Sequence, residues 1–192
     1  MAFDYKVEFK EYYSAKQTAQ LLFIPSFRYL CIEGSGKLAK GSPAFAAMHQ
    51  VALMLRSSRR LGHDVPSWFD YVLPPVESLY SAQKPFSWKV ISRLPDFFTD
   101  EDVSWAKEEA ERKTGAGCSG IKAMMISEGM CAQVMHTGPA STKREAFIRI
   151  EEYAASFGYR VDESRLRHEI PLSDPERTSR NRFRTVLRLP VC

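Results

Sequence analysis

Hydrophobic and polar residues alternate in several short segments, a pattern that predicts strands with one buried face. These segments cover residues 27–33, 68–73, 86–93, 120–127, 130–137, 165–172 and 182–189. Residues 3–9 show a similar pattern and would add an edge strand. The dipeptide Glu128-Gly129 separates two of the strands and predicts a hairpin turn between them.

Apolar residues recur at helical spacing in three other segments. Ser42 and Pro43 provide an N-cap and a first-turn proline for the first helix. Thr99 begins the second helix, and Asp102 completes a capping-box pattern three residues later. We therefore expect helices over residues 42–61, 99–113 and 141–157.

The two halves of the chain share one predicted order: strand, glycine-bearing turn, helix, strand, strand. We expect an α+β fold in which a duplicated strand-helix-strand-strand module, with pseudo-repeats at about residues 1–95 and 118–192, forms one concave antiparallel sheet. Helices would cover one face of this sheet, and the other face would form a trough between the halves. A chain of 192 residues suits one core, so we predict a single domain spanning residues 1–192.

Composition limits the classes of function. The formal charge is +4, and the basic stretches at residues 56–60 and 177–188 accompany no nucleic-acid-binding motif. None of the four cysteines forms a C-x-x-C pair, and no apolar segment is long enough to span a bilayer. We therefore expect a soluble, cytoplasmic protein with no metal, no cofactor, no membrane association and no direct nucleic-acid binding; its oligomeric state stays open.

Glu169 is the candidate functional carboxylate. Side chains alternate along a strand, so Glu169 and Ile170 point to opposite faces. If Ile170 and Leu172 pack under the helices, Glu169 faces the trough, where an unused carboxylate would be costly to desolvate. The alternative is a structural ion pair between Glu169 and one of three arginines, namely Arg167, Arg184 and Arg188.

Aromatic residues are frequent on and beside the predicted strands. Because one helical layer cannot cover both faces of the sheet, we expect some of these rings to line an open ligand cleft rather than the core. The candidate catalytic partner of Glu169 is Tyr71. The candidate ligand-binding residues are Tyr29, Phe69, Tyr80, Trp88 and His136, although a buried structural role for each of them stays open.

Five segments resemble the GyrI-like small-molecule-binding family. They are residues 74–80 (PPVESLY), 93–99 (RLPDFFT), 136–139 (HTGP), 167–175 (RHEIPLSDP) and 185–191 (TVLRLPV). The family includes the drug-sensing domains of multidrug-responsive regulators and stand-alone cyclopropanoid cyclopropyl hydrolases. The resemblance implies that Glu169 meets the ligand.

The resemblance also implies a function. We expect the chain to bind planar hydrophobic molecules and to hydrolyse cyclopropanoid DNA-alkylating toxins by ring-opening, which would protect the cell. Glu169 would activate or orient water, and Tyr71 or Tyr80 would donate a hydrogen bond to the ligand carbonyl. Two other functions stay open: a non-catalytic module that sequesters lipophilic or cationic drugs, and an inhibitor that contacts a nucleic-acid enzyme.

Overall fold

The computed structural model describes residues 2–39, 41–174 and 177–192, so Pro175 of the RHEIPLSDP segment lies outside the described residues. The strands are β1 (Gln20–Ser35), β2 (Val76–Tyr80), β3 (Ser87–Arg93), β4 (Lys122–Thr137), β5 (Arg167–Pro171) and β6 (Arg184–Pro190). The α-helices are α1 (Tyr5–Glu8), α2 (Lys10–Tyr13), α3 (Pro43–Arg56), α4 (Asp100–Thr114) and α5 (Lys143–Ser156). Short 3-10 helices are η1 (Arg59–Leu61), η2 (Ala140–Thr142) and η3 (Arg180–Arg182).

The predicted α+β class and the antiparallel sheet are confirmed, but the expected open, concave sheet with a trough on its free face is wrong, because the sheet closes on itself. The six strands form a barrel in the order β1-β3-β2-β5-β6-β4. Closure depends on β1 and β4, which are 16 residues each and pair with each other from Gln20↔Gln133 to Cys31↔Lys122. Strand, helix, strand and strand follow one another in both halves, while duplication of a module stays a prediction.

The predicted hairpin at Glu128-Gly129 is wrong, because β4 continues through these two residues. Gly129 takes a positive φ of 60° without leaving the ladder, and it pairs with Ile24 of β1. Pro25, which has no backbone N–H, lies next to this position on β1. The local glycine signal therefore marks an irregularity inside a long strand, and pairing with β1 on both sides of it prevents the chain from reversing.

Two other predicted strands are also wrong. Residues 68–73 form an irregular segment, and β2 begins only after the two prolines, at Val76. Residues 3–9 fold mainly into α1, with an N-cap at Asp4. A single parallel bridge between Phe3 and Tyr71 is the remnant of the expected strands.

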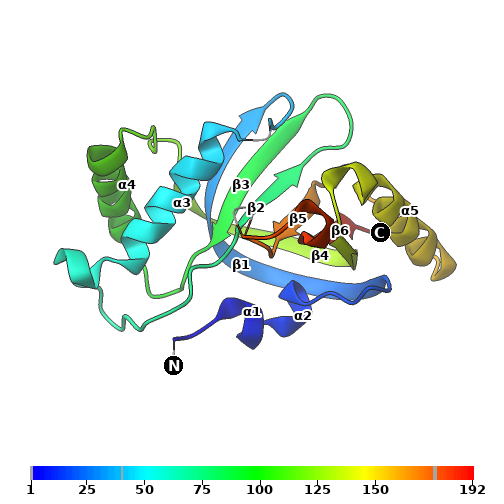
Figure 1. The fold of residues 1–192 in the computed structure, drawn as a ribbon, viewed down its shortest axis with the longest axis horizontal. Coiled ribbons are helices and arrows are strands. Elements are labelled where there is room, and N and C mark those ends of the chain that lie inside the picture. Colours follow the sequence, from blue (N-terminus) through cyan, green and yellow to red (C-terminus); the bar gives the residue numbers. More distant parts are fainter. Residues whose placement is uncertain (1, 40, 175–176) are drawn as a thin grey trace.

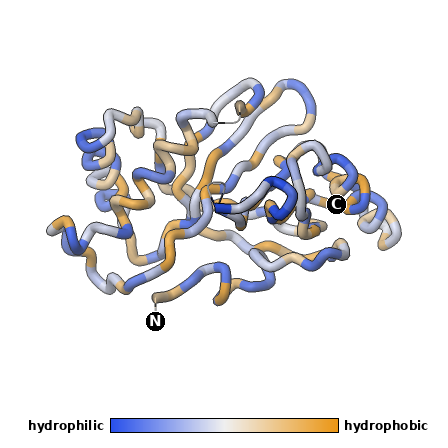
Figure 2. Tube along the Cα trace, in the orientation of Figure 1, coloured by the Kyte–Doolittle hydropathy of each residue, from blue (hydrophilic) through white to orange (hydrophobic). Residues whose placement is uncertain are grey.

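The predicted helix starts are confirmed for α3 and α4. The Ser42 side chain accepts from the backbone of Ala44, and Thr99 and Asp102 form the complete capping box. Figure 1 shows α3 and α4 side by side on one side of the barrel and α5 on the opposite side. Hydrophobic and hydrophilic positions alternate within the turns of α3 and α4 (Figure 2), because one side of each helix is buried.

The barrel interior contains a buried cluster of charged and polar groups. Arg188 of β6 contacts Glu128 at 2.5 Å and Gln133 at 3.0 Å. His168 of β5 lies 3.0 Å from Glu128 and 2.8 Å from Glu77. Each positive group therefore faces carboxylates within the barrel, and charge pairing offsets the cost of burial.

The remaining composition-based expectations concern membranes, metals and thiols. None of the helices in the described part of the chain combines the length and apolar character needed to cross a bilayer. No group of three or more His, Cys, Asp or Glu side chains among the described residues is arranged to hold a metal ion. All four cysteines are free, and Cys31, Cys118 and Cys131 are buried.

Candidate functional site

Glu169 lies on the outer face of β5, and this corrects the predicted orientation of the strand. His168 points into the barrel, where it meets Glu77 and Glu128. Glu169 follows His168 directly and therefore points outward, toward the helix α5. The expected arrangement had Ile170 under the helices and Glu169 on the opposite face. The buried charge cluster at His168 reverses that assignment.

Both carboxylate oxygens of Glu169 have partners. The Tyr80 hydroxyl donates to Oε1 at 2.7 Å, and the Lys143 ammonium forms an ion pair with Oε2. The Glu169 side chain keeps 19% of its surface exposed, and Lys143 keeps 20%. The alternative pairing with an arginine is not observed, since Arg188 binds Glu128 and Arg167 pairs with Glu163 and Glu151.

A cleft of about 850 Å³ opens beside this carboxylate, between α5, the segment joining β1 to α3, and the neighbouring ends of β2 and β3. It continues into a second hollow of about 620 Å³, which Glu169 and Lys143 also line. Such volumes are ordinary for small-molecule sites. Four aromatic side chains contribute to its walls: Phe45, Tyr80, Phe86 and Phe147.

Burial and charge set the protonation of two groups near Glu169. Burial, and then the negative charge of Glu169, raises the pKa of Tyr80 well above its ordinary value, so its hydroxyl stays protonated. Burial, and then the positive charge of Lys143, lowers the pKa of His136, so its imidazole stays neutral at neutral pH. Its Nε2 lies 2.9 Å from the Thr142 hydroxyl. Glu169 therefore has a neutral phenol and a cation as immediate neighbours.

Two of the candidate ligand-binding residues lie at or near the cleft. Tyr80 lines it directly. His136 is 4% exposed and is not among the lining residues, although the charges of Lys143 and Glu169 reach it. Trp88 pairs with Tyr80 across β2 and β3, but its ring lies against Gly34 rather than among the lining residues.

The structure does not bring the other three candidates to Glu169. Tyr71 is 2% exposed, and its ring packs against Tyr5, Phe97 and Phe98 because the segment before β2 folds onto α1 and not into the sheet. Phe69 lies in a separate aromatic pocket formed with the same segments. Tyr29 is 5% exposed inside the barrel, beside Cys31, Leu79 and Ile91.

Sequence reasoning missed Lys143, Phe45 and Phe147. The two phenylalanines lie on the apolar stripes of α3 and α5, which predict core packing, yet both line the cleft. Lys143 is the first residue of α5, directly after the HTGP segment and η2. Its place shortly after the HTGP segment is the one sequence feature that could have drawn attention to it.

The comparisons with known proteins agree with this fold. The model of the GyrI-like small molecule binding domain matches residues 85–191. A crystal structure described as a hydrolase from Listeria innocua is 31% identical over 99% of this chain and 100% of its own, with a TM-score of 0.88. The chain therefore belongs to the GyrI-like small-molecule-binding family.

Two further structures extend the comparison. A hydrolase encoded by lin2189 from Listeria innocua is 29% identical over the full length of both chains, with a TM-score of 0.89. The C-terminal domain of EcmrR is 14% identical, covering 91% of this chain and 97% of its own with a TM-score of 0.55, and this likeness concerns the fold alone. No curated protein matches the chain.

Proposed function

We propose that this protein binds a planar, largely apolar molecule in the cleft beside Glu169 and hydrolyses an activated cyclopropane in it. The observation that carries the proposal is the carboxylate of Glu169, held by Tyr80 and Lys143 at the wall of an aromatic cleft. Two Listeria innocua structures with about 30% identity are described as hydrolases, which favours a hydrolytic reaction. A cyclopropanoid DNA-alkylating toxin is the substrate class, and its destruction would protect the cell.

The reaction adds one water to a cyclopropane that is joined to a dienone. The water oxygen bonds to the cyclopropane CH₂ carbon while the C–C bond between that carbon and the dienone ring breaks. The released electron pair enters the conjugated system, and the carbonyl oxygen takes up a proton to give a phenol. The attacking water passes one proton to Glu169, which acts as the general base.

Tyr80 and Lys143 divide the supporting roles. The single hydroxyl proton of Tyr80 is committed to Glu169, so Tyr80 orients the carboxylate. An ammonium group has three donors, and Lys143 uses one on Glu169. The other two are available for the ligand carbonyl, where charge develops as the ring opens. This assignment replaces Tyr71, which lies away from the cleft, with Lys143 as the donor.

The charge of the site bears on the alternative function. A module that sequesters cationic drugs would use Glu169 as the counter-ion, but Lys143 already neutralises that carboxylate. A neutral planar ligand suits the cleft better than a cation. Sequestration without turnover remains the outcome that the experiment must separate from hydrolysis.

The test uses a spirocyclopropyl cyclohexadienone as the probe, with mass spectrometry of the products. We expect the wild-type protein to convert it to the ring-opened phenol, with the added mass of one water. Glu169→Gln should lower turnover by about 10²–10⁴ while binding of the probe, measured by Trp fluorescence, largely survives.

The matched control is Glu145→Gln, which makes the same chemical change on an exposed part of α5 away from the cleft. Its turnover should equal that of the wild type. An unchanged probe that binds the wild-type protein would leave only sequestration. Full turnover in Glu169→Gln would remove this residue from the reaction.

A further inference from the structure

A second aromatic pocket lies near α1, apart from the Glu169 cleft. Its volume is about 340 Å³, and it shares no lining residue with the cleft. The N-terminal segment, the irregular segment before β2 and the end of β3 with the residues that follow it form its walls. The lining residues are Phe3, Tyr5, Phe9, Ser67, Phe69, Arg93, Asp96 and Phe97.

Arg93, at the end of β3, is the charged group of this pocket. It is 5% exposed. Its guanidinium carbon lies 3.6 Å from the ring centroid of Phe27, 5.1 Å from that of Phe9 and 5.6 Å from that of Tyr5. Such ring contacts attract the cation, but they supply no conventional hydrogen-bond acceptor to its N–H groups.

Two of the three guanidinium nitrogens of Arg93 are left without acceptors. Nε and Nη1 are buried and have no hydrogen-bond partner among the described residues. Arg188 is equally buried, yet its donors reach Glu128, Gln133 and the carbonyl of Tyr12. A buried donor without a partner is unfavourable, and more so when it is charged. The contrast indicates that the acceptor for Arg93 comes from outside the chain.

We infer that this pocket binds a small aromatic carboxylate. The guanidinium fork matches the two oxygens of a carboxylate, while the rings of Phe3, Phe69 and Phe97 suit an aromatic body. A doubly charged phosphate fits less well, because Arg93 is the one cationic side chain among the lining residues and Asp96 adds a negative charge. The volume accommodates a single ring and a short acid chain.

The experiment titrates phenylacetate into the full chain and follows binding by NMR of labelled protein. We expect saturable binding, at least tenfold tighter than that of phenylacetamide, which has the same ring and no charge. Arg93→Met keeps the bulk of the side chain and should abolish the preference for the acid. Phe69, which is 42% exposed, is the second position tested. Phe69→Ala should weaken binding severalfold without unfolding the chain.

Lys143, which pairs with Glu169 in the other cleft, provides the control. Lys143→Met should leave phenylacetate binding unchanged, because Lys143 does not line the pocket. Loss of binding in Lys143→Met would place the acid in the other cleft and overturn the inference. Absence of binding to the wild type, or equal binding by Phe69→Ala and the wild type, would overturn it too. Neither result depends on turnover of the cyclopropane probe.

Discussion

His168 is the residue whose ionisation most affects the barrel interior. Burial alone would lower its pKa, but the charge of Glu128, the hydrogen bond to Glu128 and the contact with Glu77 together raise that pKa to about 9. The same cluster holds the pKa of Glu128 at about 2 despite burial, because of Arg188 and His168. With His168 protonated, this cluster joins two cations, His168 and Arg188, to the two carboxylates of Glu77 and Glu128.

This raised pKa predicts how stability depends on pH. The folded pKa of His168 exceeds its ordinary value of 6.5, so its contribution to the free energy of unfolding is complete below pH 6.5 and is lost as the pH rises through about 9. The contribution is on the order of 3 kcal/mol. Urea unfolding across this range should show the loss in the wild type.

Two histidine variants check this interpretation. His168→Gln should be less stable than the wild type at neutral pH. Its free energy of unfolding should also lose most of its dependence on pH between pH 6.5 and about pH 9. His49→Gln changes an exposed histidine on α3, so its pH dependence should match that of the wild type. A wild-type stability that stays level up to pH 9 would contradict the assigned ionisation.

At the scale of single residues, the sequence identified the carboxylate of Glu169 but not most of the side chains around it. Glu169 and Tyr80 were predicted to lie at the ligand site, and the structure joins them by a hydrogen bond. The partner Lys143 could not be predicted, since it comes from a helix 26 residues away whose first turn faces β5 only in three dimensions. Phe45 and Phe147 follow a helical stripe, and such a stripe does not distinguish a core wall from a cleft wall.

Among the elements, α4 depends most clearly on local chemistry. Thr99 accepts from the backbone of Asp102, Asp102 accepts from the backbone of Thr99 at 2.7 Å, and His63 lies 2.6 Å from the same carboxylate. Thr99→Ala should therefore lower the free energy of unfolding by about 1 kcal/mol, since it leaves an N-terminal donor unsatisfied. Chemical denaturation measures this difference.

A second substitution in α4 serves as the reference. Ser104→Ala removes a hydroxyl from an exposed turn of the same helix, and its effect should stay within about 0.5 kcal/mol. If Thr99→Ala changed stability no more than Ser104→Ala, the cap would have no measurable role.

Helices and strands were predictable from the sequence where local interactions decide them, and not where contacts between distant residues do. The starts of α3 and α4 were predicted because caps act over three residues. The hairpin at Glu128-Gly129 was wrong because long-range pairing with β1 decides whether a glycine turns the chain. The strand at residues 68–73 was wrong because its alternating residues pack on α1 and on Phe97 rather than on a sheet.

For the whole molecule, the N-terminal segment completes the hydrogen bonding of the barrel interior. The Tyr13 hydroxyl donates to Glu77 at 3.2 Å, Gln133 donates to the carbonyl of Glu11 at 3.0 Å, and Arg188 donates to that of Tyr12 at 2.8 Å. Figure 1 shows α1 and α2 against β1, next to the start of the chain. Interior charges thus complete their hydrogen bonding through residues that are first in the sequence.

Removal of residues 1–15 should therefore destabilise the entire barrel. We expect a large fall in the midpoint of thermal unfolding and increased binding of the dye ANS, because Glu77, Gln133 and Arg188 would lose partners and aromatic rings would be exposed. Tyr13→Phe removes one hydroxyl alone and should cost about 1 kcal/mol. An unchanged midpoint after the deletion would show that the segment is dispensable.

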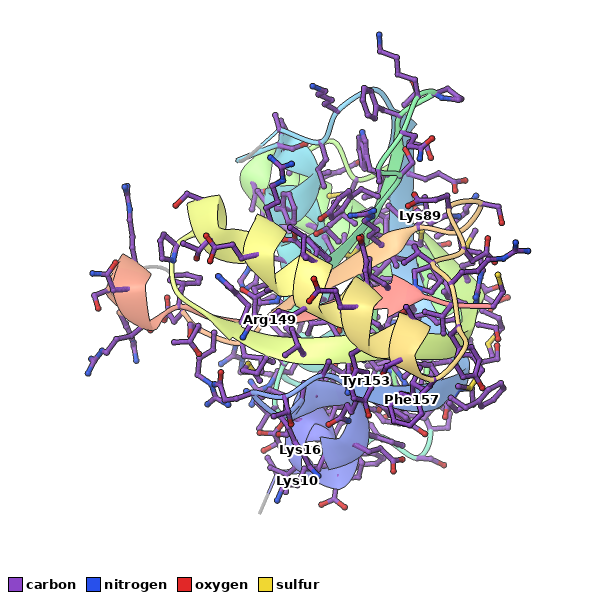
Figure 3. All side chains as sticks on the ribbon, turned by 90° about the vertical axis from the view of Figure 1, so that its right-hand side faces the viewer. Lys10, Lys16, Lys89, Arg149, Tyr153 and Phe157 are labelled. Atoms are coloured by element: carbon purple, nitrogen blue, oxygen red, sulfur yellow. The ribbon has the colours of Figure 1, made fainter. Side chains whose placement is uncertain are left out.

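On another side of the barrel, the helix α5 presents aromatic side chains to solvent. Figure 3 shows α5 crossing in front of the strands, with Arg149, Tyr153 and Phe157 along one edge of the helix. The rings of Tyr153 and Phe157 are 5.0 Å apart, and Phe157 is 59% exposed. The first turn of α5 places Lys143 at the Glu169 cleft, so this helix connects the cleft to the solvent-exposed side of the fold.

Adjacent residues of β5 serve separate purposes, and this ties the cleft to the register of the strand. Positions 167, 169 and 171 line the cleft and its neighbouring hollow, whereas positions 168 and 170 are 1% exposed and belong to the inside of the barrel. Substitutions at the odd-numbered positions can therefore alter the cleft while the barrel interior keeps its charged groups. A one-residue slip of this strand would exchange imidazole and carboxylate, so a single register has to serve both faces at once.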